Sequence, residues 1–436
     1  KVERSKSGMR NLGSTASHLC IFEDNFYRRL LPLVYFRPVY DLRCGILTLR
    51  EKILQGHPKD SVTLHCRWYL ADVVQERYPE AQVNRIESTS CLFINGRVLA
   101  DDRFLKTITE AGIEDTILTH DGSVVAVYLS GQRLEALRLK LEGVLSLSDF
   151  GDLPKKEVDV QMIRYPWDLV HRNGEQISAD FRRLTLRKKG KRLQGKVCPG
   201  AYLLNRKNIV MERGSAVKPG TVLDAEEGPI YIGKGAKVFP NSTIIGPAFV
   251  GDHSLIKTGA KIYEGTSIGE FSKVGGEVEG SVIHSYSNKQ HDGFLGHSYL
   301  GMWVNLGAST NNSDLKNNYG NVTVEIDGQK VDTGSLFVGL FMGDHSKCGI
   351  NTMFNTGTVA GVCCNIFGAD FPPKYIPSFA WGGAASLTTY DPERCAKVAE
   401  KVMTRRKGVF TAAEKKLMDR VFELTREERQ SRGLPD

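Results

Sequence analysis

Aliphatic residues recur at every sixth position in the middle of the chain. The series contains Ile232, Val238, Ile244, Val250, Ile256, Ile262, Ile268 and Val274, all of them β-branched. Glycine follows the series at Gly233, Gly251 and Gly269, at intervals of eighteen residues. Six-residue spacing fits neither an α-helix of about 3.6 residues per turn nor a strand that alternates every second residue. It predicts a parallel β-helix with three short faces per coil and one buried aliphatic side chain from each face.

The six-residue spacing extends in both directions, with interruptions. Upstream it predicts that Val210, Ala216 and Val222 point into the core, before a slip of four residues at "AEEG" that we interpret as a loop. Downstream it returns at Leu300 and Leu306, and then at Met342, Cys348, Phe354, Ala360 and Ile366. An antiparallel sandwich would not keep one period over so many positions. We therefore expect a left-handed β-helix of hexapeptide repeats over residues 206–385.

The first part of the chain has a different pattern. Buried strands are predicted at "LCIF" (19–22), "SVTLHC" (61–66), "CLFI" (91–94) and "VVAVYL" (124–129). Helical stretches such as "RCGILTLREKIL" and "YLADVVQERY" lie between them. Because strands and helices alternate, residues 19–180 are expected to form a Rossmann-like α/β domain with a mostly parallel sheet.

Three segments lie outside these two domains. Residues 1–18 are polar and lack the apolar middle of a secretory signal, so we expect a disordered lead or a vector-derived remnant. Residues 181–205 include the basic run "RRLTLRKKGKRLQGK" and are expected to be a linker with a solvated surface. Residues 386–436 form a C-terminal helical segment, in which Thr411 and Glu414 have capping-box spacing.

Composition narrows the functional class. Hydrophobic residues make up 41% of the chain and charged residues 25%, and the longest apolar runs are too short to cross a bilayer. Nine cysteines occur without a C-x-x-C pair, which predicts neither a disulfide framework nor a zinc site and favours a reducing cytoplasm. The net charge of +8 suits a phosphorylated ligand. The basic run has no interleaved aromatic residues for base stacking, so no nucleic-acid partner is expected.

Three stretches carry a resemblance to a known family. These are "LLPLVYFRPVYDLRCGILTLREK" (30–52), "YPWDLV" (165–170) and "GFLGHSYLGMWVNLGAST" (293–310). With the α/β-then-hexapeptide layout, residues 19–385 resemble the bifunctional UDP-N-acetylglucosamine pyrophosphorylase/glucosamine-1-phosphate acetyltransferase enzymes, in a divergent Bacteroidetes-type branch. The resemblance implies a nucleotidyltransferase-like first domain, an acetyl-CoA-dependent β-helix, cytoplasmic location and a homotrimer with acyl sites between neighbouring prisms.

Two histidines compete for the role of acetyltransfer base that the resemblance implies. The family pattern places the base three residues before Phe294, which is His291, whereas His297 falls where the family often has an aspartate. A neutral imidazole can take the proton from a sugar amine as the amine attacks a thioester. The alternative is a histidine bonded to the backbone of a coil. Asn305 matches the family asparagine that donates to a developing oxyanion, and its alternative is an asparagine ladder.

Other positions of the acetyltransfer site are implied by the same resemblance. Phe294 replaces a sugar-binding tyrosine, and Asp314 lies near a family asparagine. Glu279 stands where the family has a phosphate-binding lysine. Either Lys257 or Lys289 holds the sugar phosphate instead, or the acceptor is another molecule, or acetyl transfer is weak. Lys316 is a further candidate for contact with the sugar phosphate, and its alternative is a solvated lysine. Ala308 and Lys347 are expected to contact acetyl-CoA, with Lys347 meeting its phosphates.

The first domain departs further from the family. It lacks the glycine-rich phosphate loop, so we expect Arg37 and Arg43 to bind the phosphates of the nucleoside triphosphate or the sugar 1-phosphate. The central strand reads "LFINGRV", with Asn95 and Arg97 in place of an acid, and Asp168 is the one convincing Mg²⁺ ligand. Asp168 as an ordinary helix cap is the alternative.

The sequence thus predicts a bifunctional transferase that makes a nucleotide sugar with release of pyrophosphate, and that acetylates an amino-sugar phosphate. Two alternatives remain open: one activity with the other half decayed, and a non-catalytic trimeric scaffold that binds sugar nucleotides.

Overall fold

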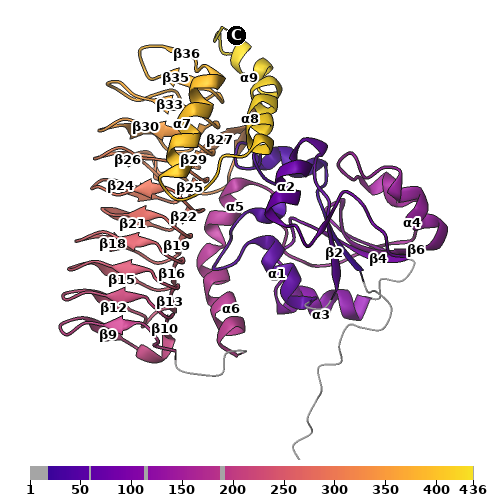
Figure 1. Ribbon diagram of the computed structural model, residues 1–436, viewed down its shortest axis with the longest axis horizontal. Helices are drawn as coiled ribbons and strands as arrows, with labels where there is room; N and C mark the ends of the chain where they lie inside the picture. Colours follow the sequence, from indigo (N-terminus) through magenta and orange to yellow (C-terminus); the bar gives the residue numbers. More distant parts are fainter. Residues whose placement is uncertain (1–17, 58–59, 112–115, 187–191, 436) are drawn as a thin grey trace, which may run out of the picture. The chain divides into compact units, whose positions relative to one another are not determined.

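The chain divides into two units in a computed structural model, which describes residues 18–57, 60–111, 116–186 and 192–435 (Figure 1). The first unit contains the chain up to Asn25 together with Arg50–Met162, and the second contains Phe26–Leu49 together with Ile163–Asp436. The sequence predicted a single boundary at 181–205, whereas this division places residues 26–49 and 163–180 in the same unit as the β-helix. Residues 26–49 and 163–186 belong to the second unit because their apolar side chains, including Ile46 and Phe181, pack against Val210 and Phe249 of the β-helix.

The first unit is built on a mixed sheet in the order β3-β2-β1-β4-β6-β5-β7. Its strands are β1 (His18–Phe22), β2 (Ser61–Leu64), β3 (Gln82–Val83), β4 (Ser90–Asn95), β5 (Ile117–His120), β6 (Ser123–Ser130) and β7 (Lys155–Glu157). β1 runs parallel to β2 and β4, whereas β6 runs antiparallel to β4 and β5. All four predicted strands and the mostly parallel α/β class are confirmed.

Short helices connect these strands. They are α2 (Ala71–Arg77), preceded by η3 (Trp68–Leu70), α3 (Asp102–Ala111), α4 (Gly131–Arg138) and η4 (Leu147–Phe150), and α1 (Leu49–Gly56) enters from the second unit. The predicted helix "RCGILTLREKIL" begins only at Leu49. Gly45 has a φ of +94°, and a Cβ there would lie 2.5 Å from Asp180 Oδ2. The residues before Leu49 therefore form a tight, buried turn instead of a helix.

The second unit is a left-handed parallel β-helix with stacked coils (Figure 1). Face one contains β10 (Ile209–Met211), β13 (Ile230–Ile232), β16 (Ala248–Val250), β19 (Thr266–Ile268), β22 (Val282–Ile283), β25 (Tyr299–Leu300), β29 (Leu340–Met342), β32 (Thr358–Ala360) and β34 (Tyr375–Ile376). Face two contains β8 (Lys196–Val197), β11 (Ala216–Val217), β14 (Lys237–Val238), β17 (Leu255–Ile256), β20 (Lys273–Val274) and β23 (Asn288–Lys289). Face two then continues, through a bridge at Asn305, as β30 (Lys347–Cys348), β33 (Asn365–Ile366), β35 (Ala380–Gly382) and the antiparallel β36 (Leu387–Thr389).

Face three is the shortest regular face. It contains β9 (Tyr202–Leu204), β12 (Val222–Asp224), β15 (Thr243–Ile245), β18 (Lys261–Ile262), β21 (Glu277–Glu279) and β24 (Phe294–Gly296), and farther along β26 (Asn311–Asn312) and β31 (Met353–Phe354). A hairpin of β27 (Thr323–Ile326) and β28 (Gln329–Asp332) interrupts the coils. Because β8 and β9 already pair with the next coil, residues 196–204 belong to the β-helix and not to a linker.

The six-residue series forms the core of this β-helix. All eight residues from Ile232 to Val274 are buried in one cluster, and so are Leu300, Leu306 and the series from Met342 to Ile366. The upstream register is wrong by one residue. Met211, Val217 and Leu223 point into the core in place of Val210, Ala216 and Val222. Val210 is also fully buried, but it packs outside the prism with Phe249 and Ile177.

Helices complete the second unit. They are η1 (Asn25–Leu30), which starts at the unit boundary, η2 (Val39–Asp41), α5 (Pro166–His171), α6 (Asn173–Leu186), η5 (Arg206–Asn208), α7 (Pro392–Thr404), α8 (Ala412–Leu424) and α9 (Arg426–Gln430). The predicted capping box of Thr411 and Glu414 begins α8. None of the described helices is both long and apolar enough to cross a membrane. The prediction for residues 1–18 falls almost entirely outside the described residues, because β1 starts at His18.

Candidate functional site

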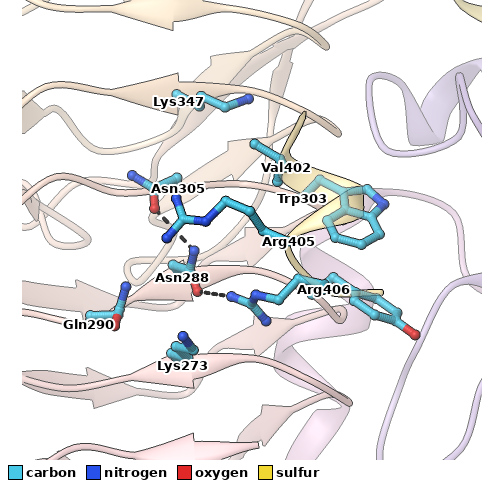
Figure 2. A pocket seen from close by; sticks show the side chains of 10 residues that line it. Lys273, Asn288, Gln290, Trp303, Asn305, Lys347, Val402, Arg405 and Arg406 are labelled. Atoms are coloured by element: carbon cyan, nitrogen blue, oxygen red, sulfur yellow. Dashed lines mark hydrogen bonds between the residues drawn. The ribbon is translucent and has the colours of Figure 1, made fainter. Parts of the chain in front are cut away.

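A polar pocket of about 370 Å³ lies on face two, beside the C-terminal end of α7 (Figure 2). Each strand of this face directs one residue outwards, and the outward positions of consecutive coils are Lys273, Asn288, Asn305 and Lys347. Two arginines that follow α7, Arg405 and Arg406, form the opposite wall together with Val402. Gln290, Tyr286 and Trp303 complete the lining.

The charge of this pocket is one-sided. Its lining contains the four cations Lys273, Lys347, Arg405 and Arg406, and no carboxylate. Burial lowers the pKa of Lys273, and repulsion from Arg406, Lys257 and Arg405 lowers it further. Burial also lowers the pKa of Lys347, whose Nζ donates to the carbonyl of His345 at 2.8 Å. A cavity in which cations repel one another favours an anionic ligand.

Hydrogen bonds fix the amide groups of the pocket. Arg406 Nη2 donates to Asn288 Oδ1 at 2.6 Å, and Asn288 Nδ2 donates to Asn305 Oδ1 at 3.2 Å (Figure 2). Asn288 and Asn305 thus form a two-step ladder, as the alternative interpretation of Asn305 anticipated. Because Oδ1 of Asn305 accepts in this ladder, its Nδ2 is oriented as a donor for another acceptor.

His291 lies at the edge of this pocket region, on the corner that joins face two to face three. The corner follows β23 directly, and Gln290, the residue before His291, lines the pocket. The side chain of His291 is exposed, and it makes no hydrogen bond to another described residue. The imidazole of His291 therefore does not bond to the backbone of a coil, which was the alternative interpretation of this residue.

His297 occupies the next corner, between faces three and one, and it is oriented by a carboxylate. Its Nδ1 lies 2.8 Å from Asp314 Oδ2, and its backbone has a φ of +43°. Phe294 and Asp314 come together here, because a Cβ on Gly296 would lie 2.5 Å from Phe294 Cζ and 2.2 Å from Asp314 Oδ2. Burial raises the pKa of Glu279, which shares this corner, and His297 opposes the shift.

Three predicted ligand residues of the β-helix are not placed as the sequence suggested. Lys289 is 2% exposed and points into the prism, so it does not reach a bound sugar phosphate. Lys316 donates to the carbonyl of Asn321 in its own loop. Ala308 is half-buried on a corner, where its carbonyl accepts from Asn351 N, and it does not line the pocket.

The two arginines predicted to bind phosphate are instead buried in the second unit. Arg37 is 1% exposed and pairs with Asp344. Arg43 pairs with Glu270 at 2.7 Å, and its Nη1 donates to the carbonyl of Ile46. Both guanidinium groups are neutralised by acids of the β-helix, so the phosphate-binding prediction for Arg37 and Arg43 is wrong.

In the first unit, the place where doubly wound sheets bind ligands is filled by charged pairs. Strand order reverses between β1 and β4, and ligands bind at the carboxyl ends of strands at such a switch point. Asp24 follows β1, and it accepts from Arg97 Nε at 2.9 Å and from Asn95 Nδ2 at 2.8 Å. Glu23 pairs with Arg67 at 3.1 Å. The sequence interpretation missed Glu23, Asp24 and Arg67, although two acids directly after a buried strand were the available signal.

The carboxylate of Asp168, which was predicted to bind Mg²⁺, serves as a helix cap. Asp168 Oδ2 accepts from Arg164 N at 2.7 Å and from Tyr165 N at 3.0 Å, so it caps α5 as the alternative anticipated. Asp168 also belongs to the second unit and not to the nucleotidyltransferase-like sheet. The residues present therefore do not fit the predicted metal role.

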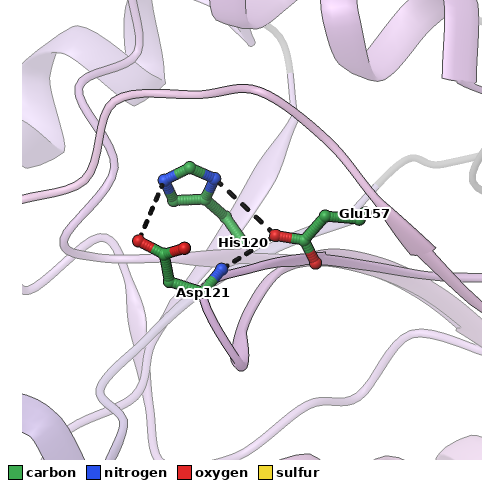
Figure 3. A group of neighbouring side chains, drawn as sticks. All are labelled: His120, Asp121 and Glu157. Carbon is green, nitrogen blue, oxygen red and sulfur yellow. Dashed lines mark hydrogen bonds and ion pairs between the residues drawn. The ribbon is translucent and has the colours of Figure 1, made fainter.

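One mixed group of potential metal ligands occurs among the described residues, at the turn between β5 and β6 (Figure 3). His120 Nε2 lies 3.7 Å from Asp121 Oδ2, whereas Nδ1 lies 3.9 Å from Glu157 Oε1 and 3.0 Å from the carbonyl of Val158. Asp121 and Glu157 face different ring nitrogens of His120. A metal ion bound to one of these nitrogens would therefore not lie beside both carboxylates. Hydrogen bonds from Thr119 and the Asp121 backbone lower the pKa of Glu157. The arrangement fits a hydrogen-bonded turn better than a metal centre.

Comparison with known proteins gives a family context. Residues 19–189 match the model of the sugar nucleotidyl transferase family. The chain is 28% identical over 293 residues to the bifunctional protein GlmU of Methanococcus aeolicus, which covers 63% of this chain and 58% of that protein. It is 32% identical over 104 residues to a bifunctional sugar-1-phosphate nucleotidylyltransferase/acetyltransferase of Sulfurisphaera tokodaii, covering 23% and 26% of the two chains. The chain thus spans less than two-thirds of the length of these relatives.

Solved structures of UDP-N-acetylglucosamine acyltransferases also align with part of the chain. The enzyme from Campylobacter jejuni aligns with 14% identity and a TM-score of 0.20, over 53% of this chain and 95% of that one. The enzyme from Francisella novicida aligns with 14% identity and a TM-score of 0.23, over 55% and 85% of the two chains.

Proposed function

We propose that this chain belongs to the bifunctional sugar nucleotidyl transferase and acyltransferase family. From this premise, we propose that it catalyses two group transfers. The first unit would join a nucleoside triphosphate to a sugar 1-phosphate and release pyrophosphate. The β-helix would transfer an acetyl group from acetyl-CoA to an amino-sugar phosphate. The first activity is supported by the family match, and Asp168 caps a helix instead of holding Mg²⁺.

The observation that carries the acetyltransferase proposal is the cationic pocket beside the His291 corner. Acetyl-CoA is an anion with several phosphate oxygens, and Lys273, Lys347, Arg405 and Arg406 supply the complementary charge. Its thioester would lie towards the amide of Asn305, whose Nδ2 donates to the carbonyl oxygen as negative charge develops there. His291 would accept the proton from the attacking amine. The thiolate of CoA leaves as the new amide bond forms, and it takes up a proton.

His297 is a second candidate for the base, because Asp314 orients its ring. A carboxylate on Nδ1 fixes the tautomer and leaves Nε2 as the acceptor, which is how general bases are commonly held. His291 has the family spacing, whereas His297 has the oriented ring. The two histidines lie on different corners of one coil, so single substitutions separate them.

Two assays test the proposal directly. Release of free thiol from acetyl-CoA with glucosamine 1-phosphate reports acetyl transfer, and a panel of other amines tests the acceptor. Release of pyrophosphate from UTP or dTTP with several sugar 1-phosphates reports nucleotidyl transfer, with and without EDTA. Thiol release alone would indicate a decayed first unit, and silence in both assays would favour a non-catalytic scaffold.

Arg405→Gln is expected to raise the KM for acetyl-CoA by roughly 3- to 5-fold and to leave kcat unchanged, because an exposed cation contributes modestly to binding a phosphate. The KM should also become less sensitive to salt. Acetyl-pantetheine, which lacks the nucleotide phosphates, should show no change. Lys261→Gln is the matched control, because Lys261 lies on face three and pairs with Glu277 at 3.0 Å. Equal effects on both thioesters would contradict the phosphate role.

A homotrimer is the proposed assembly, and exposed apolar side chains on the C-terminal coils of the β-helix support it. Ile350 is 69% exposed, and Met353, Phe367 and Trp381 are each about two-fifths exposed. Such a patch on a folded protein marks a contact surface. Sedimentation equilibrium is expected to give three times the monomer mass, and Ile350→Asp should shift the distribution towards monomer. A monomeric wild-type protein at micromolar concentration would contradict this assembly.

A further inference from the structure

A lysine interrupts one of the aliphatic columns inside the β-helix. The inward positions of face two run through Val238, Ile256, Val274 and then Lys289, and Val274 pairs directly with Lys289 between β20 and β23. The next inward residue of this column is Leu306, whose amide donates to the carbonyl of Asn288. Lys289 is 2% exposed, so its whole side chain is enclosed by the coils.

The ammonium group of Lys289 ties two corners of the prism together. Its Nζ donates to the carbonyl of Gly275 at 3.0 Å, in the coil below, and to the carbonyl of His291 at 2.9 Å, in its own coil. Gly276 leaves the space for this arrangement, because a Cβ there would lie 2.7 Å from both Lys289 Nζ and the His291 carbonyl oxygen. The corner that carries His291 is thus held by its main chain from inside the prism.

Packing does not account for a lysine at this position. Burial lowers the pKa of Lys289 to about 8, although the carboxylates of Asp292 and Glu277 favour the charged form. Since the unfolded chain holds the proton more tightly, burying the ammonium opposes folding at neutral pH. Every neighbouring inward position of the column is aliphatic, and an aliphatic residue would avoid this cost. The benefit must therefore lie in the two hydrogen bonds.

We propose that Lys289 is a positioning residue for acetyl transfer, an inference that rests on the proposed function of His291. Its charged ammonium fixes the main chain of His291 and so sets the direction in which the exposed imidazole approaches the acceptor amine. Charge-assisted hydrogen bonds are stronger than neutral ones, so loss of the proton weakens both contacts. Among the described residues, the charged and titratable groups near Lys289 are His291 and Asp292 on its own corner and Glu277 on β21, and Lys257 lies two coils below, against Gly275.

Lys289→Met tests this role, because methionine fills the column without an ammonium. At pH 7 the kcat of thiol release is expected to fall roughly 10- to 100-fold, since small misplacements of a reacting group are costly, while the KM for acetyl-CoA stays the same. The melting temperature should be unchanged or higher. In the wild type kcat should decline as pH rises above about 8, and this alkaline decline should disappear in Lys289→Met. Leu306→Met, one coil along the same column, controls for a methionine in the core.

Hydrogen exchange of the amides of residues 290–293 gives a readout that does not depend on activity. Exchange there is expected to be faster in Lys289→Met than in the wild type or in Leu306→Met. If the wild type acetylates an acceptor but Lys289→Met keeps its kcat, its alkaline decline and its exchange rates, the positioning role is overturned. If the wild type releases no thiol with any acceptor, the proposed acetyltransferase function fails, and the positioning role falls with it.

Discussion

His291→Ala is expected to lower the kcat of acetyl transfer by roughly 10²- to 10⁴-fold, the contribution typical of a general base. Pyrophosphate release should be unchanged, because His291 lies in the β-helix and not in the first unit. The KM for acetyl-CoA should also stay the same, since the cations of the pocket remain. Parallel thiol and pyrophosphate assays on one preparation check both statements.

His297→Ala is the matched comparison, because it removes the other corner histidine of the same coil. We expect a smaller loss of kcat, accompanied by a lower melting temperature, since Asp314 loses its partner and shares the corner with the partly buried Glu279. Asp314→Asn should reproduce part of that destabilisation. If His297→Ala removes thiol release and His291→Ala preserves it, the family spacing has been applied to the wrong histidine.

Arg37→Leu is expected to lower the free energy of unfolding of the second unit by about 3–5 kcal/mol, because it leaves the buried carboxylate of Asp344 without its counter-charge. Urea unfolding followed by the fluorescence of the tryptophans measures this change. The KM for the nucleoside triphosphate should not respond, in contrast to a phosphate-binding arginine.

Arg37→Leu/Asp344→Asn separates the cost of an orphaned charge from other effects. Asparagine keeps the acceptor that Asp344 Oδ1 offers to Met302 N, at 3.1 Å, but carries no charge. Most of the lost stability should therefore return in the double variant. A double variant as unstable as Arg37→Leu would show that the guanidinium acts through packing rather than through the ion pair.

The core of the β-helix was predictable from Ile232 to Val274, because the six-residue spacing runs through eight positions without a slip, and all eight predictions are confirmed. The unbroken spacing decides between neighbours even where both are apolar, as in Ile244–Ile245 and Leu255–Ile256. Upstream, the slip at "AEEG" separates the strands from this series, and both neighbours are apolar in Val210–Met211 and Val222–Leu223. The sequence then does not distinguish the inward residue from the outward one. Val210 is apolar because side chains from segments distant in the sequence, such as Ile46 and Ile177, pack against the outer side of face one.

The roles of charged residues were less predictable, because their partners lie far away along the chain. Arg37 and Asp344 are separated by 307 positions, and no local pattern connects them. Lys289 follows an asparagine in a polar stretch and was interpreted as an exposed ligand. Its inward direction follows only from the register with Val274, across a coil shortened by a tight turn at Gly275 and Gly276. Asn305 and Lys347 do share a pocket, because the same outward position recurs on successive coils.

The path of the chain between the two units limits how the protein can be dissected. Residues 26–49 precede most of the first unit in sequence, yet they bury Ile46 against the β-helix, and Arg43 and Arg37 neutralise acids of its coils. A fragment cut at the start of the first coil would expose Val210 and Phe249 and leave Glu270 and Asp344 without their arginines. An expression plan that separates the two units must therefore retain residues 26–49 and 163–186 with the prism, for example by replacing the intervening stretch with a short linker.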